Sequence, residues 1–179
     1  SEALLELLNG YFRRMVDIVF KYDGTLDKFV GDALIVVFND PLDQPDAERR
    51  AVMCAAEMQR EIARFNKEQE AAGKKTLGVG IGVHCGMVVA GNVGSESRME
   101  YTVMGEAVNF ASRLQGKAPA GAVYVSTALL SKTSRVLAIN LSSSVVEAIN
   151  PSGLIYSFLK FCSEYLISSR YRYASPKGL

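Results

Sequence analysis

The twelve residues from Asp27 to Phe38 read DKFVGDALIVVF, and this stretch decides the fold. Strand-forming residues fill Thr25 to Phe29 and Ala33 to Phe38, and only a short turn that ends at Asp32 separates them. A connection this short predicts a β-hairpin. The carboxylate of Asp32 allows two interpretations: it caps a backbone N–H group, as turn aspartates commonly do, or it binds a cation at the edge of the sheet.

Helical patterns flank the hairpin on both sides. Apolar residues recur at helical spacing from Glu2 to about Lys21, and a second helix is expected from Pro45 or Asp46 to Ala71. The stretch from Leu77 to Val83 reads LGVGIGV and alternates large residues with very small ones. This alternation predicts a strand with one packed face and one nearly bare face, against which another element can lie closely.

The remaining pattern completes an α+β fold. We expect strands at Met87 to Asn92 and Val123 to Val125, an extended piece at Tyr101 to Met104, and a helix from Gly105 to Leu114. The order helix, hairpin, helix, strand pair, helix, strand predicts a ferredoxin-like βαββαβ sandwich that lacks its first strand. We expect that strand to precede Ser1.

Composition narrows the function classes. The chain has 179 residues, 22% of them charged, and a net charge of +1, which argues against a broad surface for nucleic acid or membrane. Cys54, Cys85 and Cys162 are far apart and odd in number, which indicates reduced thiols in a cytoplasmic protein. His84 is the only histidine, so we expect a hydrogen-bonded strand histidine and no histidine-based triad or metal site.

Two blocks of the sequence together resemble one enzyme family. Lys28 to Asp32 reads KFVGD before an apolar strand, and Gly78 to Leu114 reads GVGIGVHCGMVVAGNVGSESRMEYTVMGEAVNFASRL. In order and separation, these blocks resemble the catalytic domains of class III adenylyl and guanylyl cyclases, with coverage from about Glu2 to Leu130. The resemblance implies a catalytic domain over residues 1–134 and a divergent part over 135–179, with a last strand at Leu154 to Phe161 and a tail.

For this family, the resemblance implies attack of a nucleotide 3′-hydroxyl on its own α-phosphorus, which forms a 3′,5′-cyclic nucleotide and pyrophosphate. It implies two divalent ions, Mg²⁺ or Mn²⁺, held by aspartates, and it assigns Asp32 to a metal. The family's other metal aspartate lies on the first strand in a Phe-x-Asp pattern, and no such pattern precedes Glu2. If the polypeptide begins at Ser1, half of the metal cage is absent and we expect no activity.

The resemblance also assigns two residues to the nucleotide base. Lys28 occupies the purine-reading position, where lysine implies adenine because an ammonium donates to the ring-nitrogen acceptor. Thr102 occupies the partner position, where its hydroxyl accepts from the adenine amino group, and the Lys/Thr pair resembles a subgroup of adenylyl cyclases that use ATP. The alternative for Lys28 is a solvent-facing strand lysine, and the alternative for Thr102 is an ordinary β-branched strand residue.

Asn109 and Arg113 are spaced i, i+4 and therefore share one face of the expected helix. The resemblance assigns Asn109 to the ribose and Arg113 to the transition-state phosphate. A planar guanidinium can form two parallel hydrogen bonds to phosphate oxygens. The alternative is an exposed helix with a surface arginine. In the family, the Asp/Lys set and the Asn/Arg set of one site come from different subunits, which implies a head-to-tail homodimer. Arg98 to Tyr101 would support this contact from a projecting β arm.

Two functions from different classes follow from these assignments. The first is an adenylyl cyclase domain that converts ATP to cyclic AMP. The second is an inactive cyclase-homology module that dimerises without turnover. A guanylyl cyclase is the nearest competitor within the first class, and Lys28 counts against it.

Overall fold

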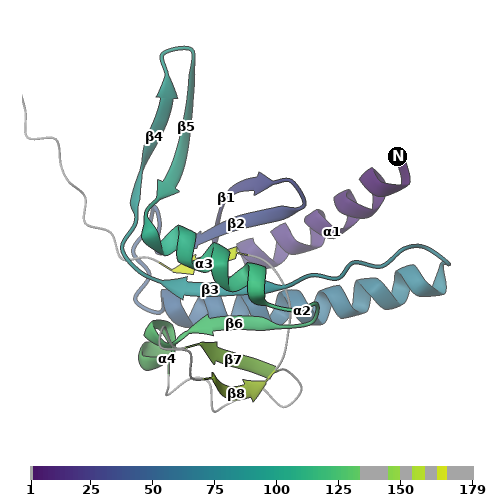
Figure 1. The fold of residues 1–179 in the computed structure, drawn as a ribbon. Coiled ribbons are helices and arrows are strands. Elements are labelled where there is room, and N and C mark those ends of the chain that lie inside the picture. Colours follow the sequence, from purple (N-terminus) through teal and green to yellow (C-terminus); the bar gives the residue numbers. More distant parts are fainter. Residues whose placement is uncertain (1, 134–144, 150–154, 160–164, 169–179) are drawn as a thin grey trace, which may run out of the picture.

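The structure is a computed structural model that describes residues 2–133, 145–149, 155–159 and 165–168, with side chains described over 2–133. Its elements follow in the order α1 (Glu2–Lys21), β1 (Thr25–Val30), β2 (Ala33–Phe38), α2 (Ala47–Ala71), β3 (Ile81–Cys85), β4 (Val89–Ser95), β5 (Arg98–Met104), α3 (Glu106–Lys117), β6 (Val123–Ser126), α4 (Thr127–Thr133), β7 (Val145–Ile149), β8 (Ile155–Leu159) and β9 (Tyr165–Ser168) (Figure 1).

The predicted hairpin is confirmed. β1 and β2 pair antiparallel, with Val30 opposite Ala33, and the register shifts between Leu26 and Lys28. Gly31 has a φ of +63° at the turn, a conformation that glycine adopts without a steric cost. This turn leaves Asp32 exposed. The sequence pattern therefore placed the acidic residue correctly at the tip of the hairpin.

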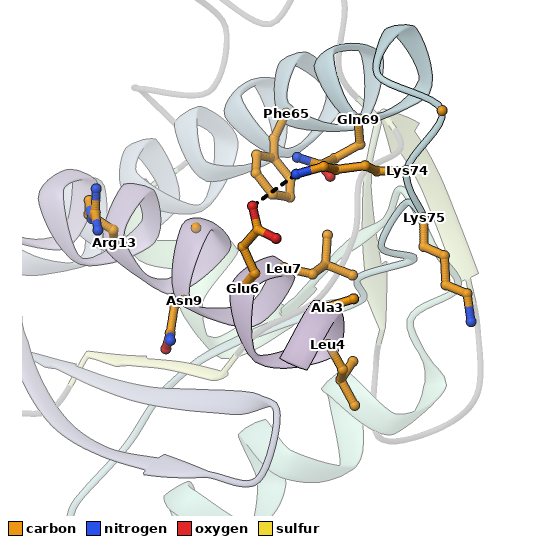
Figure 2. A pocket seen from close by; sticks show the side chains of 12 residues that line it. Ala3, Leu4, Glu6, Leu7, Asn9, Arg13, Phe65, Gln69, Lys74 and Lys75 are labelled. Carbon is orange, nitrogen blue, oxygen red and sulfur yellow. Dashed lines mark hydrogen bonds and ion pairs between the residues drawn. The ribbon is translucent and has the colours of Figure 1, made fainter. Parts of the chain in front are cut away.

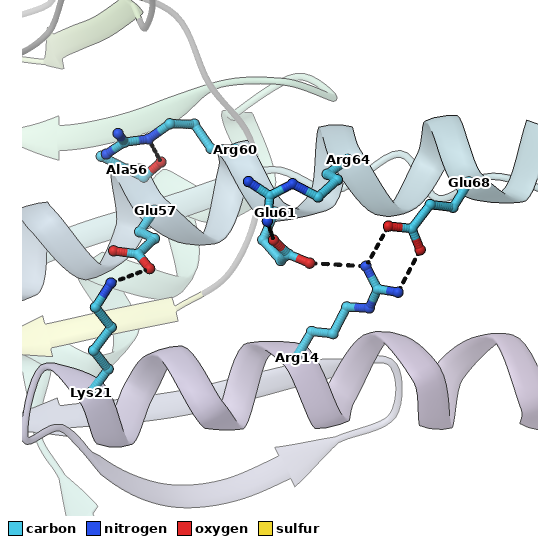
Figure 3. A network of polar contacts seen from close by, with 8 residues as sticks. All are labelled: Arg14, Lys21, Ala56, Glu57, Arg60, Glu61, Arg64 and Glu68. Carbon is cyan, nitrogen blue, oxygen red and sulfur yellow. Dashed lines mark hydrogen bonds and ion pairs between the residues drawn. The ribbon is translucent and has the colours of Figure 1, made fainter.

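Helices α1 and α2 cover one face of the main sheet. Their apolar sides meet alternate residues of β2 and β3 in the largest core cluster, which includes Tyr11, Met15, Met58, Leu34, Val36, Ile81 and Val83. Ion pairs join the two helices along their outer side (Figure 3): Arg14 lies 2.9 Å from Glu61 and 2.5 Å from Glu68, and Lys21 lies 2.6 Å from Glu57. No helix in the described chain is long and apolar enough to cross a membrane.

Helix α3 covers the opposite face of the sheet, where Ala107 and Ala111 pack on Val37 of β2. The approach to β3 is close: a Cβ atom at Gly82 would collide with the carbonyl oxygen of Ala111. The nearly bare face predicted from the Leu77–Val83 pattern is therefore confirmed. The predicted bounds were wrong, because the strand begins at Ile81 and continues to Cys85.

The main sheet has the strand order β1-β2-β9-β3-β6-β7-β8. The predicted α+β class is confirmed, and no strand precedes α1 among the described residues. β2 and β3 do not pair with each other, because β9 lies between them and runs parallel to both. The sequence analysis did not predict β9, β7 or α4. The predicted strand at Leu154 to Phe161 corresponds to β8, which ends at Leu159.

Strands β4 and β5 form a separate two-stranded sheet that projects from the body as an arm (Figure 1). Val103 near its base is buried in the cluster under α3. Farther out, Val93 and Met99 are 42% and 57% exposed. The arm thus presents apolar side chains to solvent, as a surface for contact with another molecule does.

Candidate active site

One group of side chains joins the hairpin to the arm: Asp27, Lys28, Glu100 and Thr102. We call it the base-reading cluster, after the predicted contact of Lys28 and Thr102 with the nucleotide base. The ammonium of Lys28 lies 3.8 Å from Oδ2 of Asp27 and 3.6 Å from Oε1 of Glu100. The hydroxyl of Thr102 donates to the same Oδ2 atom of Asp27 over 3.1 Å. β1 and β5 thus bring the two predicted base-binding residues, Lys28 and Thr102, onto one carboxylate.

Asp27 is the buried centre of this cluster. Its side chain is 5% exposed, and burial raises the pKa of its carboxyl above the ordinary value. The Lys28 ammonium and the Thr102 hydroxyl stabilise the charged form and act in the opposite direction. Glu100 and Asp40 raise the pKa further through their negative charge. The carboxylate therefore depends on two partners that compensate for part of its lost hydration.

A neighbouring contact ties the arm to the loop after β2. The hydroxyl of Tyr101 donates to Oδ1 of Asp40 over 3.1 Å. Successive strand residues point to opposite faces, so Tyr101 and Thr102 attach the two faces of β5 to the body. The base of the arm is thus held in place beside the base-reading cluster.

Asp32 borders a different hollow. It lines a cavity of about 260 Å³ together with Leu8 and Tyr11 of α1, Gly80 before β3 and Gln115 of α3. Tyr11 is 2% exposed, and its hydroxyl has no hydrogen-bond partner among the described residues. A buried hydroxyl without a partner is costly. The cavity therefore offers one carboxylate and one unsatisfied hydroxyl to a polar occupant.

The described residues fit only part of the predicted metal site. No three His, Cys, Asp or Glu side chains among them lie close enough together to hold a metal ion. Mg²⁺ takes one or two carboxylates together with substrate phosphates and waters. Asp32 suits one such position, and no second carboxylate among the described residues lines its cavity.

Asn109 and Arg113 lie on α3, as predicted, and both are exposed. The Arg113 guanidinium carbon lies 5.6 Å from the centroid of the Phe110 ring, and the centroid of the His84 ring lies 4.5 Å from the same centroid. Nδ1 of His84 is 2.8 Å from Oγ of Ser126. The prediction of a hydrogen-bonded strand histidine is confirmed. Burial of the His84 ring lowers the pKa of this side chain, and the positive charge of Lys132 acts in the same direction.

The residues predicted to bind a metal, the ribose and the transition-state phosphate are not joined to one another within one chain. No hydrogen bond or ion pair joins Asp32 to Asn109 or Arg113 among the described residues. Thr102 comes just before the N-terminus of α3, whereas Asp32 shares its cavity with Gln115 near the C-terminus. A helix of 12 residues is about 18 Å long, so Asp32 and the base-reading cluster lie near opposite ends of α3.

A larger cavity, of about 820 Å³, lies between the N-terminal part of α1 and the C-terminal part of α2 (Figure 2). Phe65 and Leu7 line its apolar part, and Glu6 and Lys74 face each other across it at 2.8 Å. None of the predicted site residues lines this cavity. The candidate active site therefore consists of the base-reading cluster, the exposed face of α3 and the cavity at Asp32.

Comparison with known proteins shows the family of this chain. Residues 1–154 match the family described as the adenylate and guanylate cyclase catalytic domain. The chain belongs to this family.

The cyclase domain is 35% identical to adenylate cyclase 1 of Rhizobium meliloti over 115 residues, which are 64% of this chain and 17% of that protein. It is 38% identical over 117 residues to an adenylate cyclase of Anabaena cylindrica, of which it covers 22%. The chain thus spans about a fifth of the length of these relatives.

Solved structures of cyclases resemble the domain closely. The guanylyl cyclase Cya2 superposes with a TM-score of 0.71 at 32% identity, over 90% of this chain and 80% of that one. The adenylyl cyclase CyaB from P. aeruginosa superposes with a TM-score of 0.68 at 34% identity, over 76% and 71%. The predicted cyclase fold is confirmed. Since one neighbour is a guanylyl and the other an adenylyl cyclase, fold similarity does not choose the base.

The sequence analysis missed Asp27, Tyr11 and Phe110. Asp27 carried a signal, because aspartate is rare within strands and its presence beside Lys28 calls for a reason. Tyr11 carried none, since a tyrosine on an apolar helix face reads as core. Only the structure shows that the Phe110 ring lies close to both His84 and Arg113.

Proposed function

We propose that this cyclase domain converts ATP to 3′,5′-cyclic AMP and pyrophosphate. The observation that carries the choice of ATP is the attachment of both Lys28 and Thr102 to Asp27, with the ammonium at 3.8 Å and the hydroxyl at 3.1 Å. An ammonium donates to N1 of adenine, and a hydroxyl oxygen accepts from its amino group. Lysine has no acceptor for the N1–H group of guanine, which favours ATP over GTP.

In the proposed reaction, the ribose 3′-oxygen forms a bond to the α-phosphorus, and the bond from this phosphorus to the pyrophosphate oxygen breaks. The 3′-hydroxyl loses its proton to water, and pyrophosphate leaves with the electron pair of the broken bond. Asn109 orients the ribose, and Arg113 stabilises the charge that develops on the phosphate oxygens. Both side chains are exposed and free of ion pairs among the described residues, so they are open to a ligand.

We propose that Asp32 contributes one ligand to a site for two divalent ions, Mg²⁺ or Mn²⁺. Such ions neutralise phosphate charge and lower the pKa of the attacking hydroxyl when they are bound. What supports this assignment is the exposed carboxylate at a tight turn, beside a cavity of about 260 Å³. The remaining ligands would come from the substrate, from water and from residues outside those described.

We further propose a homodimer with shared sites, and the geometry changes how the residues are grouped. Lys28 lies beside Thr102, and Thr102 is followed within a few residues by α3. Lys28 therefore belongs with Asn109 and Arg113 of its own chain, facing Asp32 of the partner subunit. The sequence-based grouping had placed Lys28 with Asp32. The exposed apolar side chains of the arm support such a contact.

An inactive dimerising module is the second candidate function. The observation that favours it is the single metal-binding carboxylate at the Asp32 cavity among the described residues.

A cytoplasmic location, no contact with nucleic acid and no membrane contact by the domain itself complete the proposal. They are supported by the net charge of +1 and by the need for cellular ATP.

The deciding experiment is a turnover assay with ATP and GTP in the presence of Mn²⁺, on this chain and on the full-length protein. Cyclic AMP from the full-length protein, with little cyclic GMP, is the expected result. Binding of ATP without turnover in both proteins would support the dimerising module instead. Faster turnover of GTP than of ATP would contradict the assigned role of Lys28.

A further inference from the structure

We infer that Asp27 sets the nucleotide preference of the domain by making Thr102 a hydrogen-bond acceptor and Lys28 a donor at one base site. This inference rests on the proposed function and deepens it. Asp27 is a positioning residue here: it acts on the base through two other side chains.

The first step concerns the hydroxyl of Thr102. An ionised carboxylate only accepts hydrogen bonds, so the single proton of the Thr102 hydroxyl points to Oδ2 of Asp27. Only the lone pairs of the hydroxyl oxygen then remain for a ligand. Thr102 is 8% exposed and the Asp27 side chain 5%, so water does not readily replace this bond.

The second step concerns Lys28. Its ammonium lies near the carboxylates of Asp27 and Glu100, at 3.8 and 3.6 Å, and an ammonium donates hydrogen bonds but accepts none. The Lys28 side chain is 27% exposed, so part of it still faces solvent. Asp27 thus presents a charged donor and a neutral acceptor side by side.

The third step is complementarity to the base. The Watson–Crick edge of adenine has an acceptor at N1 and a donor amino group at C6, and the same edge of guanine has a donor at N1 and an acceptor at O6. The pair formed by Lys28 and Thr102 matches adenine at both positions. Without Asp27, the Thr102 hydroxyl could rotate and donate to O6 of guanine, which would remove one of the two mismatches.

The test is equilibrium binding of ATP and GTP, measured by displacement of a fluorescent ribose-labelled ATP from the whole chain. Asp27→Leu removes the acceptor and keeps the branching and the number of heavy atoms of the side chain, and the preference for ATP over GTP should fall about tenfold, the effect of one hydrogen bond. Asp27→Asn keeps an oxygen acceptor and should retain most of the preference. Asp17→Leu, at an exposed position on α1, is the matched control and should leave the ratio unchanged.

A second pair of variants keeps the inference testable if Asp27→Leu does not fold. Thr102→Ser keeps the hydroxyl and should keep the preference, whereas Thr102→Val should reduce it. The inference is overturned if Asp27→Leu and Thr102→Val both leave the ratio within twofold of the wild type, or if the wild type has no preference for ATP. Turnover is measured separately, so failure of catalysis with an intact binding preference would count against the proposed function alone.

Discussion

The two ends of the candidate site differ in how far one chain completes them. In the base-reading cluster, Lys28 and Thr102 meet on the buried Asp27 over distances of 3.8 and 3.1 Å. At the phosphate end, Asp32, Asn109 and Arg113 are exposed, and no hydrogen bond or ion pair joins them to one another among the described residues. The side chains at one end are joined by the fold of a single chain, whereas those at the other end are not.

This difference has a physical meaning. Polar groups that are already aligned lose little entropy when they bind a ligand, so a base that binds beside Asp27 would meet groups already in place. The exposed guanidinium of Arg113 is hydrated in one chain, and its attraction to a phosphate would strengthen where a second surface excludes water. Selection of the base and catalysis are thus expected to respond separately to mutation.

The largest effect is expected from loss of Asp32 or Asn109, which the proposed homodimer would bring together from different subunits. Asp32→Ala and Asn109→Ala should each lower turnover at least about a hundredfold, because the first loses the proposed metal ligand and the second loses the side chain proposed to orient the ribose. Mixing the two variants should restore up to about a quarter of the activity, since half of the dimers are mixed and each has one intact site of two. Exposed Asp17→Ala is the control.

The same mixing experiment tests the grouping of Lys28. Lys28→Glu chains mixed with Asn109→Ala chains should not recover ATP turnover, because both residues serve the same site from one chain. Recovery in that mixture would show that Lys28 works with Asp32. Absence of recovery in the Asp32 and Asn109 mixture, with mixed dimers confirmed, would end the shared-site proposal.

The next effect concerns Arg113. Arg113→Ala should reduce kcat about a hundred- to a thousandfold with a small change in KM, because the guanidinium acts on charge that develops only in the transition state. Steady-state kinetics with ATP measure both constants. Arg64→Ala, whose side chain is 70% exposed on α2, should change neither. Equal losses in kcat and in ATP affinity would indicate ground-state binding instead.

A smaller effect is expected when the base-reading cluster is altered. Lys28→Glu places a carboxylate beside Asp27 and Glu100 and should lower the ratio of ATP to GTP turnover about tenfold or more, since a carboxylate accepts from guanine. Competition assays with both nucleotides measure this ratio. Lys67→Glu, at an exposed position on α2, is the control with the same charge change. An unchanged ratio in Lys28→Glu would refute base recognition by Lys28.

The smallest effect separates the two ends by stability. Thr102→Val should lower the free energy of unfolding by about 1 kcal/mol, because Asp27 loses a hydrogen bond in a buried place, and it should raise the pKa of that carboxyl further. Arg113→Ala should stay within about 0.5 kcal/mol of the wild type, as most exposed substitutions do. Urea titrations measure both values, and equal losses would contradict the difference between the two ends.

Several features were predictable from the printed sequence because they depend on neighbours along the chain. Helix α1 has the predicted bounds, Glu2–Lys21, since its apolar spacing and the glycine at position 24 act locally. The hairpin followed from the short turn before Ala33, and α3 from the periodicity that places Asn109 and Arg113 on one face. These patterns, with the two cyclase-like blocks, were sufficient for the fold class and the family.

Other features were not predictable because they depend on contacts between distant segments. β3 was expected from Leu77, but the ladder begins at Ile81, where Val123 of β6 becomes its partner. β4 and β5 were predicted too short, because their pairing from Val89 to Ser95 extends beyond the apolar stretch. The insertion of β9 between β2 and β3 depends on backbone hydrogen bonds that leave no mark on local periodicity.

The sequence by itself determined which residues this protein can use: a carboxylate at a glycine turn, a lysine before it, and an amide and an arginine one helical turn apart. These depend on spacing within one element, where the backbone geometry is known in advance. Only the tertiary structure decided which of them meet. It joined Lys28 to Thr102 through Asp27 and left Asp32 near the other end of α3, because burial and the contact between β1 and β5 arise only when the whole chain packs.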